Sequence, residues 1–379
     1  MNNVLLAGNG FDLAHGLPTK YGDFLCLIKN WAFFLEHYKR EKMQNDDYFL
    51  KKYLTNKDSI NVDNIEELNK IIQKNSWINY FEKCEAEVDG WIDFEKEIIP
   101  VIVFFDFLFQ CDVRFNSSYN KVEIARDYFP TAQMLRIAKL WKNYVTVDIT
   151  SVTINTNYSS KQYGILKKKM MEEIRREFDE FIRAFEIYLL EFVDKTENIK
   201  PIEQIASLNI TSVVSFNYTL TENLYGIEPE RVHHIHGMIR EDKDLRPNNM
   251  VLGINEQPEQ KMDFIYFVKY FQRIQKATGT YYKELLKRRM RDKDDLKDKY
   301  TLYVYGHSLD ETDGDILKYL IGDIDSKGIF VLKPEKVCIF YYDIDDYEQK
   351  VINLIKLYGR NIVETYIEKQ FFEFLLIEK

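Results

Sequence analysis

An apolar run that leads directly into a glycine-rich turn restricts the fold of this chain more than any other feature. Val4–Ala7 precede Gly8-Asn9-Gly10. A buried parallel strand that ends in such a turn directs backbone amides toward a phosphate group. A dehydrogenase fingerprint needs a third glycine three residues after the second, where this chain has Leu13. The next glycine is Gly16, so we predict a longer phosphate-binding loop and a following helix that begins near Thr19.

The overall composition indicates a folded protein of the cytoplasm. The chain has 379 residues, 15% of them aromatic, and a formal net charge of −9, which argues against general binding to nucleic acid or anionic membranes. The N-terminus leads into the first predicted strand without a basic leader, and the most apolar stretch, residues 98–109, is too short to span a bilayer. The four scattered cysteines include no Cys-x-x-Cys pair, so we expect no structural zinc site and a reducing environment.

Strand and helix patterns divide the chain into an α/β domain and an insertion. After about residue 208, short apolar runs alternate with helical ones, which is typical of a doubly wound, mostly parallel sheet. We therefore predict a nucleotide-binding α/β domain from residues 1–30 and 206–379, of Rossmann type, interrupted by a large, mainly helical insertion from residues 31–205. The predicted strands after residue 208 are Ile210–Phe216, Val232–Ile235, Val251–Ile254, Leu302–Tyr305 and Val337–Tyr342. The predicted helices between them are Met262–Ile274, Thr280–Met290, Gly314–Ile321 and Asp346–Tyr358.

Two patterns in the insertion are clear enough to interpret. In the predicted helix Ile165–Asp194, the spacing of Ile174, Phe178, Phe181, Phe185 and Leu189 indicates an amphipathic stripe that faces a core. The segment Val145–Tyr158 is rich in Thr, Val and Asn, and we expect a strand or hairpin there.

The loop after the first strand carries two polar side chains of interest. Asp12 and His15 lie inside it, and each has a ligand-binding and a structural interpretation. For Asp12 the structural alternative is a local backbone cap, and for His15 it is a surface side chain.

Three later segments also place polar residues where a predicted strand ends. Asn217 follows the first of these strands, and ligands of open α/β sheets bind outside the carboxyl ends of strands. Its amide suits a ribose hydroxyl or a bound water, and an Asx-turn that closes the strand is the alternative. His236 ends the second, where an imidazole suits proton transfer near neutral pH; a metal site formed by His233, His234 and His236 is the less favoured alternative. Ser308, after Gly306, suits a ribose or phosphate oxygen or a helix cap.

Taken together, these motifs resemble a known family. Gly-Asn-Gly-Phe-Asp-Leu-Ala-His-Gly-Leu-Pro-Thr, Ser-Phe-Asn-Tyr-Thr, His-Ile-His-Gly and Gly-His-Ser-Leu are similar to those of the AbiH family, bacterial proteins associated with abortive infection by phage. The order of the motifs also resembles the more distant sirtuin fold, in which equivalent turns surround NAD. The resemblance implies a sirtuin-like α/β fold.

The resemblance also implies roles for individual residues. Asn217 is expected to be the catalytic amide and His236 the catalytic imidazole. Two departures from the sirtuin pattern concern carboxylates: Asp12 stands where sirtuins have a small hydroxyl residue, and Thr219 replaces the aspartate that follows the catalytic asparagine. The expected NAD-binding residues are Gly8, Asn9, Gly10, Phe11, Asp12, Gly16, Pro18, Thr219, Gly306 and Ser308.

These features lead to one functional hypothesis and two alternatives. We expect an antiphage effector that binds NAD, or a related dinucleotide, as its substrate and hydrolyses the nicotinamide–ribose bond without a metal. A phage-derived trigger and a homo-oligomer are further expected partners. One alternative is a catalytically silent nucleotide-sensing or partner-binding module, because of the missing aspartate at Thr219. The less favoured one is a nuclease that uses the basic run Lys287–Arg291.

Overall fold

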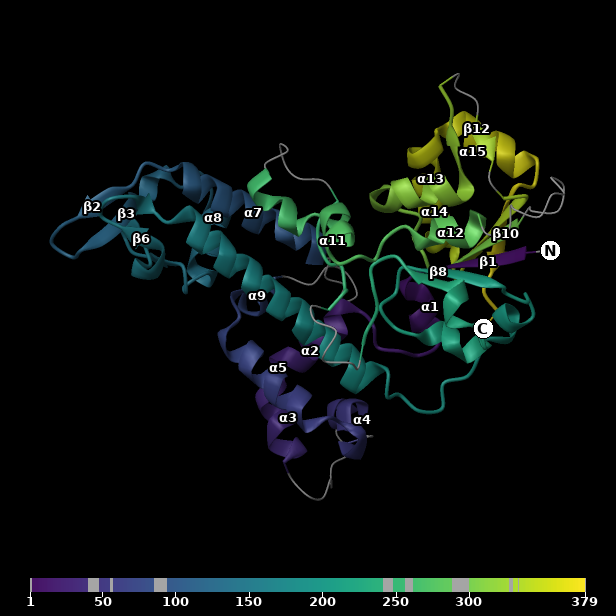
Figure 1. Cartoon of the computed structure of the whole chain (residues 1–379), viewed down its shortest axis with the longest axis horizontal. Helices are drawn as coiled ribbons and strands as arrows, with labels where there is room; N and C mark the ends of the chain where they lie inside the picture. Colours follow the sequence, from purple (N-terminus) through teal and green to yellow (C-terminus); the bar gives the residue numbers. More distant parts are fainter. Residues whose placement is uncertain are drawn as a thin grey trace. The chain divides into compact units, whose positions relative to one another are not determined.

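The chain folds into two compact units. The computed structural model describes residues 2–39, 48–54, 57–84, 94–240, 248–255, 262–287, 300–326, 330–332 and 334–378 (Figure 1). We call residues 1–19, 196–251 and 273–379 the sheet unit, and residues 20–195 and 252–272 the helical unit. The boundaries at residues 30 and 205, which we expected for separate domains, stay a prediction.

A six-stranded sheet forms the centre of the sheet unit. All its neighbouring strands pair in parallel, in the spatial order β14-β13-β10-β1-β8-β9. β8 and β9, which follow β1 in the chain, lie on one side of it, and β10, β13 and β14 lie on the other. This is the doubly wound order of nucleotide-binding folds. The predicted α/β class with a parallel sheet is therefore confirmed. The strands are β1 (Asn2–Ala7), β8 (Ser212–Ser215), β9 (Val232–His234), β10 (Tyr300–Tyr305), β13 (Lys336–Tyr341) and β14 (Phe372–Leu376).

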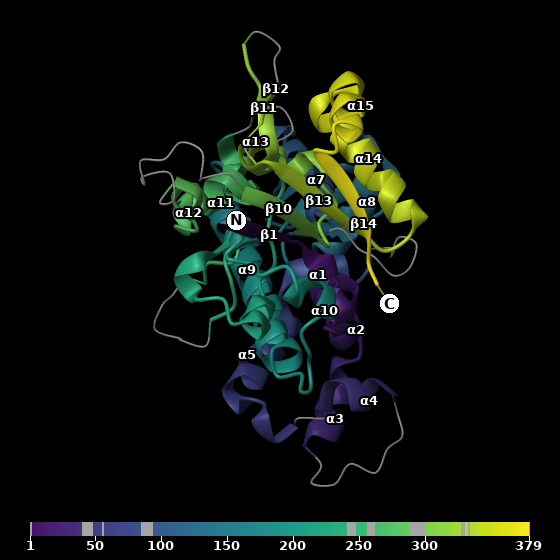
Figure 2. The ribbon, with the colours of Figure 1, turned by 90° about the vertical axis from the view of Figure 1, so that its right-hand side faces the viewer.

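Helices cover both faces of this sheet, as β1 illustrates. Because successive side chains of a strand point to opposite faces, Val4 and Leu6 lie in one buried cluster while Leu5 and Ala7 lie in another. Figure 2 shows α14 and α15 on one side of the sheet and α1 and α10 on the other. The first cluster includes residues of α12 (Tyr281–Lys287), α13 (Gly314–Ile321), α14 (Ile344–Tyr358) and α15 (Arg360–Glu368). The second includes residues of α1 (Asn9–Ala14) and α10 (Glu203–Ala206).

Short elements complete the sheet unit. Strands β11 (Gly322–Ile324) and β12 (Phe330–Leu332) form a separate antiparallel pair. Three 3₁₀ turns are η6 (Thr221–Tyr225), η7 (Pro229–Arg231) and η10 (Glu311–Asp313).

The helical unit is built around the long helix α9 (Lys167–Tyr188), which continues as a π-helical turn, η5 (Leu189–Val193). The predicted apolar stripe from Ile174 to Leu189 is buried, which confirms that this face packs into a core. The other helices are α2 (Tyr21–Lys29), α3 (Trp31–Tyr38), α4 (Tyr48–Leu54), α5 (Val62–Lys74), α6 (Ser76–Phe81), α7 (Phe94–Gln110), α8 (Ala132–Leu140) and most of α11 (Lys269–Gln275). The 3₁₀ turns are η1 (Lys57–Ser59), η3 (Arg126–Tyr128), η4 (Thr156–Tyr158) and η9 (Met262–Phe267).

Two small antiparallel sheets also belong to the helical unit. The hairpin expected within Val145–Tyr158 is present as β4 (Val145–Val147) and β5 (Ser151–Ile154). It extends to a four-stranded sheet with β2 (Arg114–Asn116) and β3 (Lys121–Ala125), and β6 (Ser159–Ser160) pairs with β7 (Gly164–Ile165).

The structure corrects three local expectations. The helix expected near Thr19 begins earlier, at Asn9, because the glycine turn leads straight into α1; α2 then starts at Tyr21. The predicted strand Val251–Ile254 joins no sheet, and Ile254 makes only an isolated bridge to Val268. The sixth strand, β14, was not predicted, because Glu373 interrupts its apolar residues. The part of the predicted helix Thr280–Met290 beyond residue 287 lies outside the described residues, as does most of the basic run 287–291.

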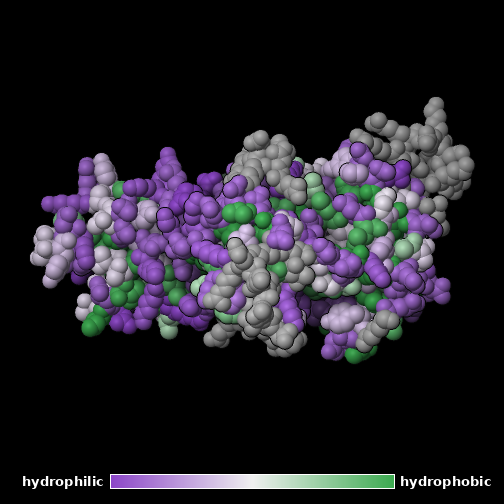
Figure 3. All heavy atoms as spheres, turned by 90° about the horizontal axis from the view of Figure 1, so that it is seen from below, coloured by the Kyte–Doolittle hydropathy of each residue, from purple (hydrophilic) through white to green (hydrophobic). Residues whose placement is uncertain are grey.

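The surface carries no large uniform apolar region on the face shown in Figure 3, where hydrophilic and hydrophobic residues are interspersed. Among the helices that the structure describes, none has the length and apolar character needed to cross a membrane.

Candidate functional site

The register of the sheet brings the predicted polar residues to one edge. Ala7 of β1 pairs with Ser215 of β8 and Tyr305 of β10, and Ser215 pairs with His234 of β9. Two residues beyond this aligned row, at the carboxyl ends of the four strands, the chain places Asn9, Asn217, His236 and His307. The strand order reverses between β1 and β10, and the carboxyl ends of strands at such a reversal are the usual ligand-binding position in open α/β sheets.

The glycine turn after β1 packs tightly against the turn after β10. The Gly8 amide donates to the Tyr305 carbonyl over 3.0 Å, and the Gly10 amide donates to the Gly306 carbonyl over 2.9 Å. Gly306 has a φ of +68°, and a Cβ there would lie 2.1 Å from the Phe11 nitrogen. Only glycine fits this crossing, since both the positive φ and the close approach exclude a side chain.

This packing occupies backbone amides of the loop that could otherwise donate hydrogen bonds to a ligand. Besides the Gly8 and Gly10 amides, the Phe11 amide donates within the turn, to the Gly8 carbonyl over 2.8 Å. A diphosphate at this edge must therefore take its hydrogen bonds from groups other than these three amides. Asn9 is one neighbour with a side-chain amide, and its Oδ1 accepts a hydrogen bond from the Thr19 hydroxyl over 2.7 Å.

Asp12 is an almost completely buried carboxylate at this edge. It lies in α1 with 1% of its surface exposed, and its carboxylate accepts hydrogen bonds from the hydroxyls of Thr219 over 2.6 Å and Thr221 over 2.7 Å. Burial raises the pKa of Asp12 to about 6, although these hydroxyls act in the opposite direction; the charge of Glu222 adds to the increase. Thr219, which stands where the sirtuin pattern has an aspartate, is thus hydrogen-bonded to a carboxylate from α1.

Hydrogen bonds from its side chain and its backbone hold Asn217 in place. Its side-chain amide donates to the Gly8 carbonyl over 3.0 Å, and its backbone amide donates to the Ser215 hydroxyl over 3.1 Å. Its backbone carbonyl oxygen lies 2.9 Å from Nδ1 of His234. The amide side chain therefore links the end of β8 to the glycine turn of β1.

The three neighbouring histidines occupy different environments. His234 contacts Glu222 through Nε2 over 3.0 Å, and although burial lowers its pKa, the hydrogen bond and charge of Glu222 outweigh burial and raise it. His233 lies 2.7 Å from the Thr278 carbonyl through Nε2, and burial lowers its pKa to about 4. Both rings are thus engaged by the protein, whereas His236 belongs to a separate cluster.

That cluster joins the ends of β9 and β10. Nε2 of His236 lies 3.9 Å from Oδ1 of Asp313, and Nε2 of His307 lies 3.5 Å from Oδ2 of the same carboxylate. The Phe216 ring contacts both imidazoles, with centroid distances of 5.4 Å to His236 and 4.4 Å to His307. Asp313 thus lies between two buried histidines from neighbouring strand ends.

The remaining predicted residues lie around this edge. Ser308 is exposed, and its carbonyl accepts a hydrogen bond from Asn353 over 2.9 Å. His15 bridges the Phe11 carbonyl and the Tyr225 hydroxyl, which gives it a structural role. Gly16 has a φ of +77° in open space, and Pro18 follows it in the same loop.

Several residues of the site were not singled out from the sequence. They are Thr221 and Glu222, which follow the Asn217 motif, and His307, which lies between the predicted Gly306 and Ser308. A signal for the first two was present in the polar run after β8. For His307 the signal was its position two residues beyond a strand end, the same position as Asn217 and His236.

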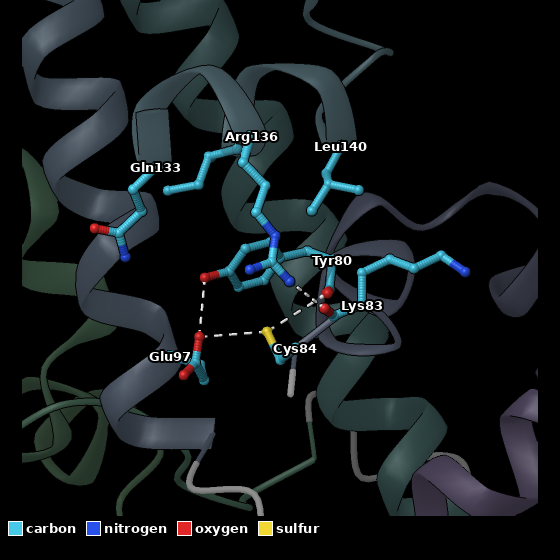
Figure 4. A pocket seen from close by; sticks show the side chains of 8 residues that line it. Tyr80, Lys83, Cys84, Glu97, Gln133, Arg136 and Leu140 are labelled. Atoms are coloured by element: carbon cyan, nitrogen blue, oxygen red, sulfur yellow. Dashed lines mark hydrogen bonds between the residues drawn. The ribbon is translucent and has the colours of Figure 1, made fainter. Parts of the chain in front are cut away.

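A separate pocket of about 210 Å³ lies in the helical unit. Figure 4 shows the Tyr80 hydroxyl and the Cys84 thiol both directed toward Glu97, over 3.1 Å and 3.3 Å. The Arg136 guanidinium donates to the Lys83 carbonyl over 2.7 Å. Burial, together with the charge of Glu97, raises the pKa of Cys84 to about 12, so this thiol is not a nucleophile at neutral pH.

Comparison with known proteins identifies one family. The family model described as Bacteriophage abortive infection AbiH matches residues 4–332, a range that includes every residue of the edge described above. No curated protein and no solved structure matches the chain.

Proposed function

The chain belongs to the AbiH family of bacteriophage abortive infection proteins, and from this premise we propose that it is an effector that hydrolyses the nicotinamide–ribose bond of NAD. Loss of NAD would stop the growth of an infected cell before the phage multiplies. The substrate would bind at the carboxyl edge of the sheet, between the turns that follow β1 and β10.

The observation that carries this proposal is the common position of Asn217, His236 and His307. All three lie two residues beyond the aligned ends of parallel strands, beside the position where the strand order reverses. Dinucleotides bind at such positions in folds with this strand order. An amide and an imidazole there supply the two functions that glycosidic hydrolysis of NAD requires, namely orientation of a water and acceptance of its proton.

In the proposed reaction, the nicotinamide ring departs while a water attacks C1′ of the ribose. The C1′–N bond breaks with its electron pair going to the ring nitrogen, which neutralises the pyridinium and makes it a good leaving group. Asn217 orients the water and the ribose, and His236 accepts the proton that the water loses as it bonds to C1′. The products are nicotinamide and ADP-ribose.

The second candidate is a nucleotide-sensing module without turnover. The observation that favours it is the hydrogen bond from the Asn217 amide to the Gly8 carbonyl, which commits one donor of the proposed catalytic side chain to the protein itself. In the hydrolase, this bond must be exchanged for one to substrate or water when NAD binds.

One experiment separates these functions. Purified full-length protein is incubated with NAD, with and without a lysate of phage-infected cells, and nicotinamide and ADP-ribose are separated by chromatography. We expect both products from the wild type and at least a hundredfold slower formation with Asn217→Ala or His236→Gln, on the order of a general acid–base contribution. Asn361→Ala, an exposed residue of α15, and His37→Gln, in the helical unit, are the matched controls and should retain wild-type rates.

The other outcomes identify the alternatives. Intact NAD under every triggering condition, together with tight NAD binding measured by calorimetry, would contradict hydrolysis and support the sensing module. Cleavage of DNA or RNA that persists in both site variants would place the activity elsewhere in the chain.

A further inference from the structure

The two ring nitrogens of His234 both face oxygen atoms that accept hydrogen bonds. Nδ1 lies 2.9 Å from the backbone carbonyl oxygen of Asn217, and Nε2 lies 3.0 Å from Oε1 of Glu222. A carbonyl has no hydrogen to donate, so the contact to Asn217 requires a proton on Nδ1. The contact to Glu222 needs a second proton, and the raised pKa of His234 places it on the ring, which then donates both bonds.

Burial makes this pair a poor source of stability. Only 9% of His234 and 3% of Glu222 is exposed, so both charges lose most of their contact with water. The cost of removing such a pair from water is often as large as the attraction between the charges, and apolar side chains of similar volume stabilise a fold at least as well. What the pair does supply is a fixed direction for the proton on Nδ1.

That proton holds the backbone of Asn217. The amide of the same residue donates to the Ser215 hydroxyl over 3.1 Å. Ser215 and His234 are partners in the register of β8 and β9, so two facing residues of the sheet bind the two backbone polar groups of Asn217. In the proposed reaction the bond from the Asn217 side chain to the Gly8 carbonyl is exchanged, whereas these backbone bonds can stay in place. They keep Asn217 at the edge of the sheet while its amide binds substrate.

Glu222 is held in turn by the residue before it. The turn η6 begins at Thr221, whose hydroxyl donates to the Asp12 carboxylate over 2.7 Å. Thr219 donates to the other oxygen of the same carboxylate over 2.6 Å. The segment after Asn217 is therefore attached to α1, which places Glu222 against His234.

We infer that His234, paired with Glu222, is a positioning residue: its Nδ1 proton fixes the backbone of Asn217 so that the amide side chain meets water and ribose in the correct orientation. The inference rests on the proposed function, because that function assigns catalysis to Asn217. Neither His234 nor Glu222 needs to touch the substrate. A misplacement of about 1 Å can slow a reaction about a hundredfold, so loss of this one backbone bond should be visible in kcat.

The two ring nitrogens can be replaced one at a time. Asparagine places its amide nitrogen near the position of Nδ1, and glutamine, which is longer by one methylene, places it near that of Nε2. His234→Asn therefore keeps a donor for the Asn217 carbonyl, and His234→Gln keeps one for Glu222. In the full-length protein we expect His234→Gln to lower kcat for NAD hydrolysis about tenfold to a hundredfold with KM within about threefold, and His234→Asn to retain kcat within about threefold. Equal losses of kcat in both variants, or a larger loss in His234→Asn, would overturn the inference.

Two further variants distinguish this effect from a general loosening of β9. His234→Asn combined with Glu222→Gln leaves no unpaired carboxylate buried and should also retain kcat within about threefold. His233→Gln is the matched control, because His233 is also buried and points to the opposite face of β9, where it contacts the Thr278 carbonyl over 2.7 Å and the Tyr282 amide over 2.9 Å. Its kcat and KM should stay within about twofold of wild type, and a loss as large as that of His234→Gln would overturn the inference.

A spectroscopic readout does not depend on hydrolysis. ¹⁵N nuclear magnetic resonance of histidine-labelled protein shows which ring nitrogens carry protons, and the signals of His234, one of only six histidines, are assigned by their loss in His234→Asn. At pH 7 we expect protons on both nitrogens in the wild type and on Nδ1 alone in Glu222→Gln, where burial lowers the pKa of His234 without opposition from a carboxylate at Glu222. An Nδ1 without a proton in either protein would overturn the inference even if the wild type hydrolyses NAD. Intact NAD together with a protonated Nδ1 in both proteins would instead reject the proposed function and leave the bond from His234 to Asn217 standing.

Discussion

Replacement of Asp12 by asparagine should stabilise the sheet unit, in a manner that depends on pH. Burial raises the pKa of this carboxyl from 3.8 to about 6. A native pKa above the unfolded one means that the stability this group contributes is complete below about pH 4 and is lost as the pH rises through 6. At 1.36 kcal/mol per pKa unit, ionised Asp12 costs about 3 kcal/mol at pH 7 relative to its neutral form. Asparagine has nearly the same shape and stays neutral.

We therefore expect Asp12→Asn to match the wild type near pH 4 and to exceed its unfolding free energy by up to about 3 kcal/mol at pH 7. One threonine hydroxyl can keep donating to the amide oxygen of asparagine while the other rotates to accept from its amide nitrogen, so the hydrogen bonds need not be lost. A matched control is Asp343→Asn, an exposed cap of α14 where asparagine caps equally well; its effect should be small and independent of pH.

The measurement must report on the sheet unit itself. All four tryptophans, at positions 31, 77, 91 and 141, lie within residues 20–195, so their fluorescence follows the helical unit. Hydrogen exchange by mass spectrometry on peptides that cover β1, α1 and β8 gives the local unfolding free energy at each pH. A difference between Asp12→Asn and wild type that is the same at pH 4.5 and pH 7.5 would refute the reasoning, because the effect would then not come from ionisation.

Three further predictions follow from the same structure. Gly306→Ala should destabilise the sheet unit by about 3 kcal/mol or more in thermal or denaturant unfolding, because the new Cβ would lie 2.1 Å from a backbone nitrogen. Gly16→Ala has a similar positive φ but open space around it, so it should cost only about 1 kcal/mol, and equal effects of the two changes would contradict the packing argument. Glu222→Gln should lower the unfolding free energy by about 3 kcal/mol and should lower the raised pKa of His234. The titration of the His234 imidazole proton resonance measures this pKa, and an unchanged titration would show that the pair is not coupled. Cys84 should react with iodoacetamide at pH 8 far more slowly in the native protein than in the denatured chain, and equal rates would contradict its raised pKa.

Local patterns predicted the strands that carry the site. The apolar run 4–7 before two glycines, and the runs that precede Asn217 and His236, form β1, β8 and β9. Each is short, apolar and followed by residues suited to turns, so the signal is contained in a few adjacent residues. The amphipathic stripe of α9 could be predicted for the same reason, because a hydrophobic period of 3.6 residues is a property of one short segment.

The errors came where distant segments decide the local conformation. The turn after β1 enters a helix at once because Gly8 and Gly10 hydrogen-bond the turn after β10, almost 300 residues later. Val251–Ile254 has the composition of a strand, but only Ile254 makes a bridge. Conversely, β14 contains Glu373, and it is a strand because it pairs along β13 at the edge of the sheet.

The sequence by itself determined that this chain has a parallel α/β sheet, that its first turn contains glycines and that polar residues follow its strands. Only the tertiary structure decided how those residues combine. It placed the carboxylate of Asp12 against Thr219, attached the Asn217 amide to Gly8, and set Asp313 between His236 and His307. The physical reason is register: strands more than 200 residues apart in the chain align their ends within one sheet, and no local pattern records which ends will meet.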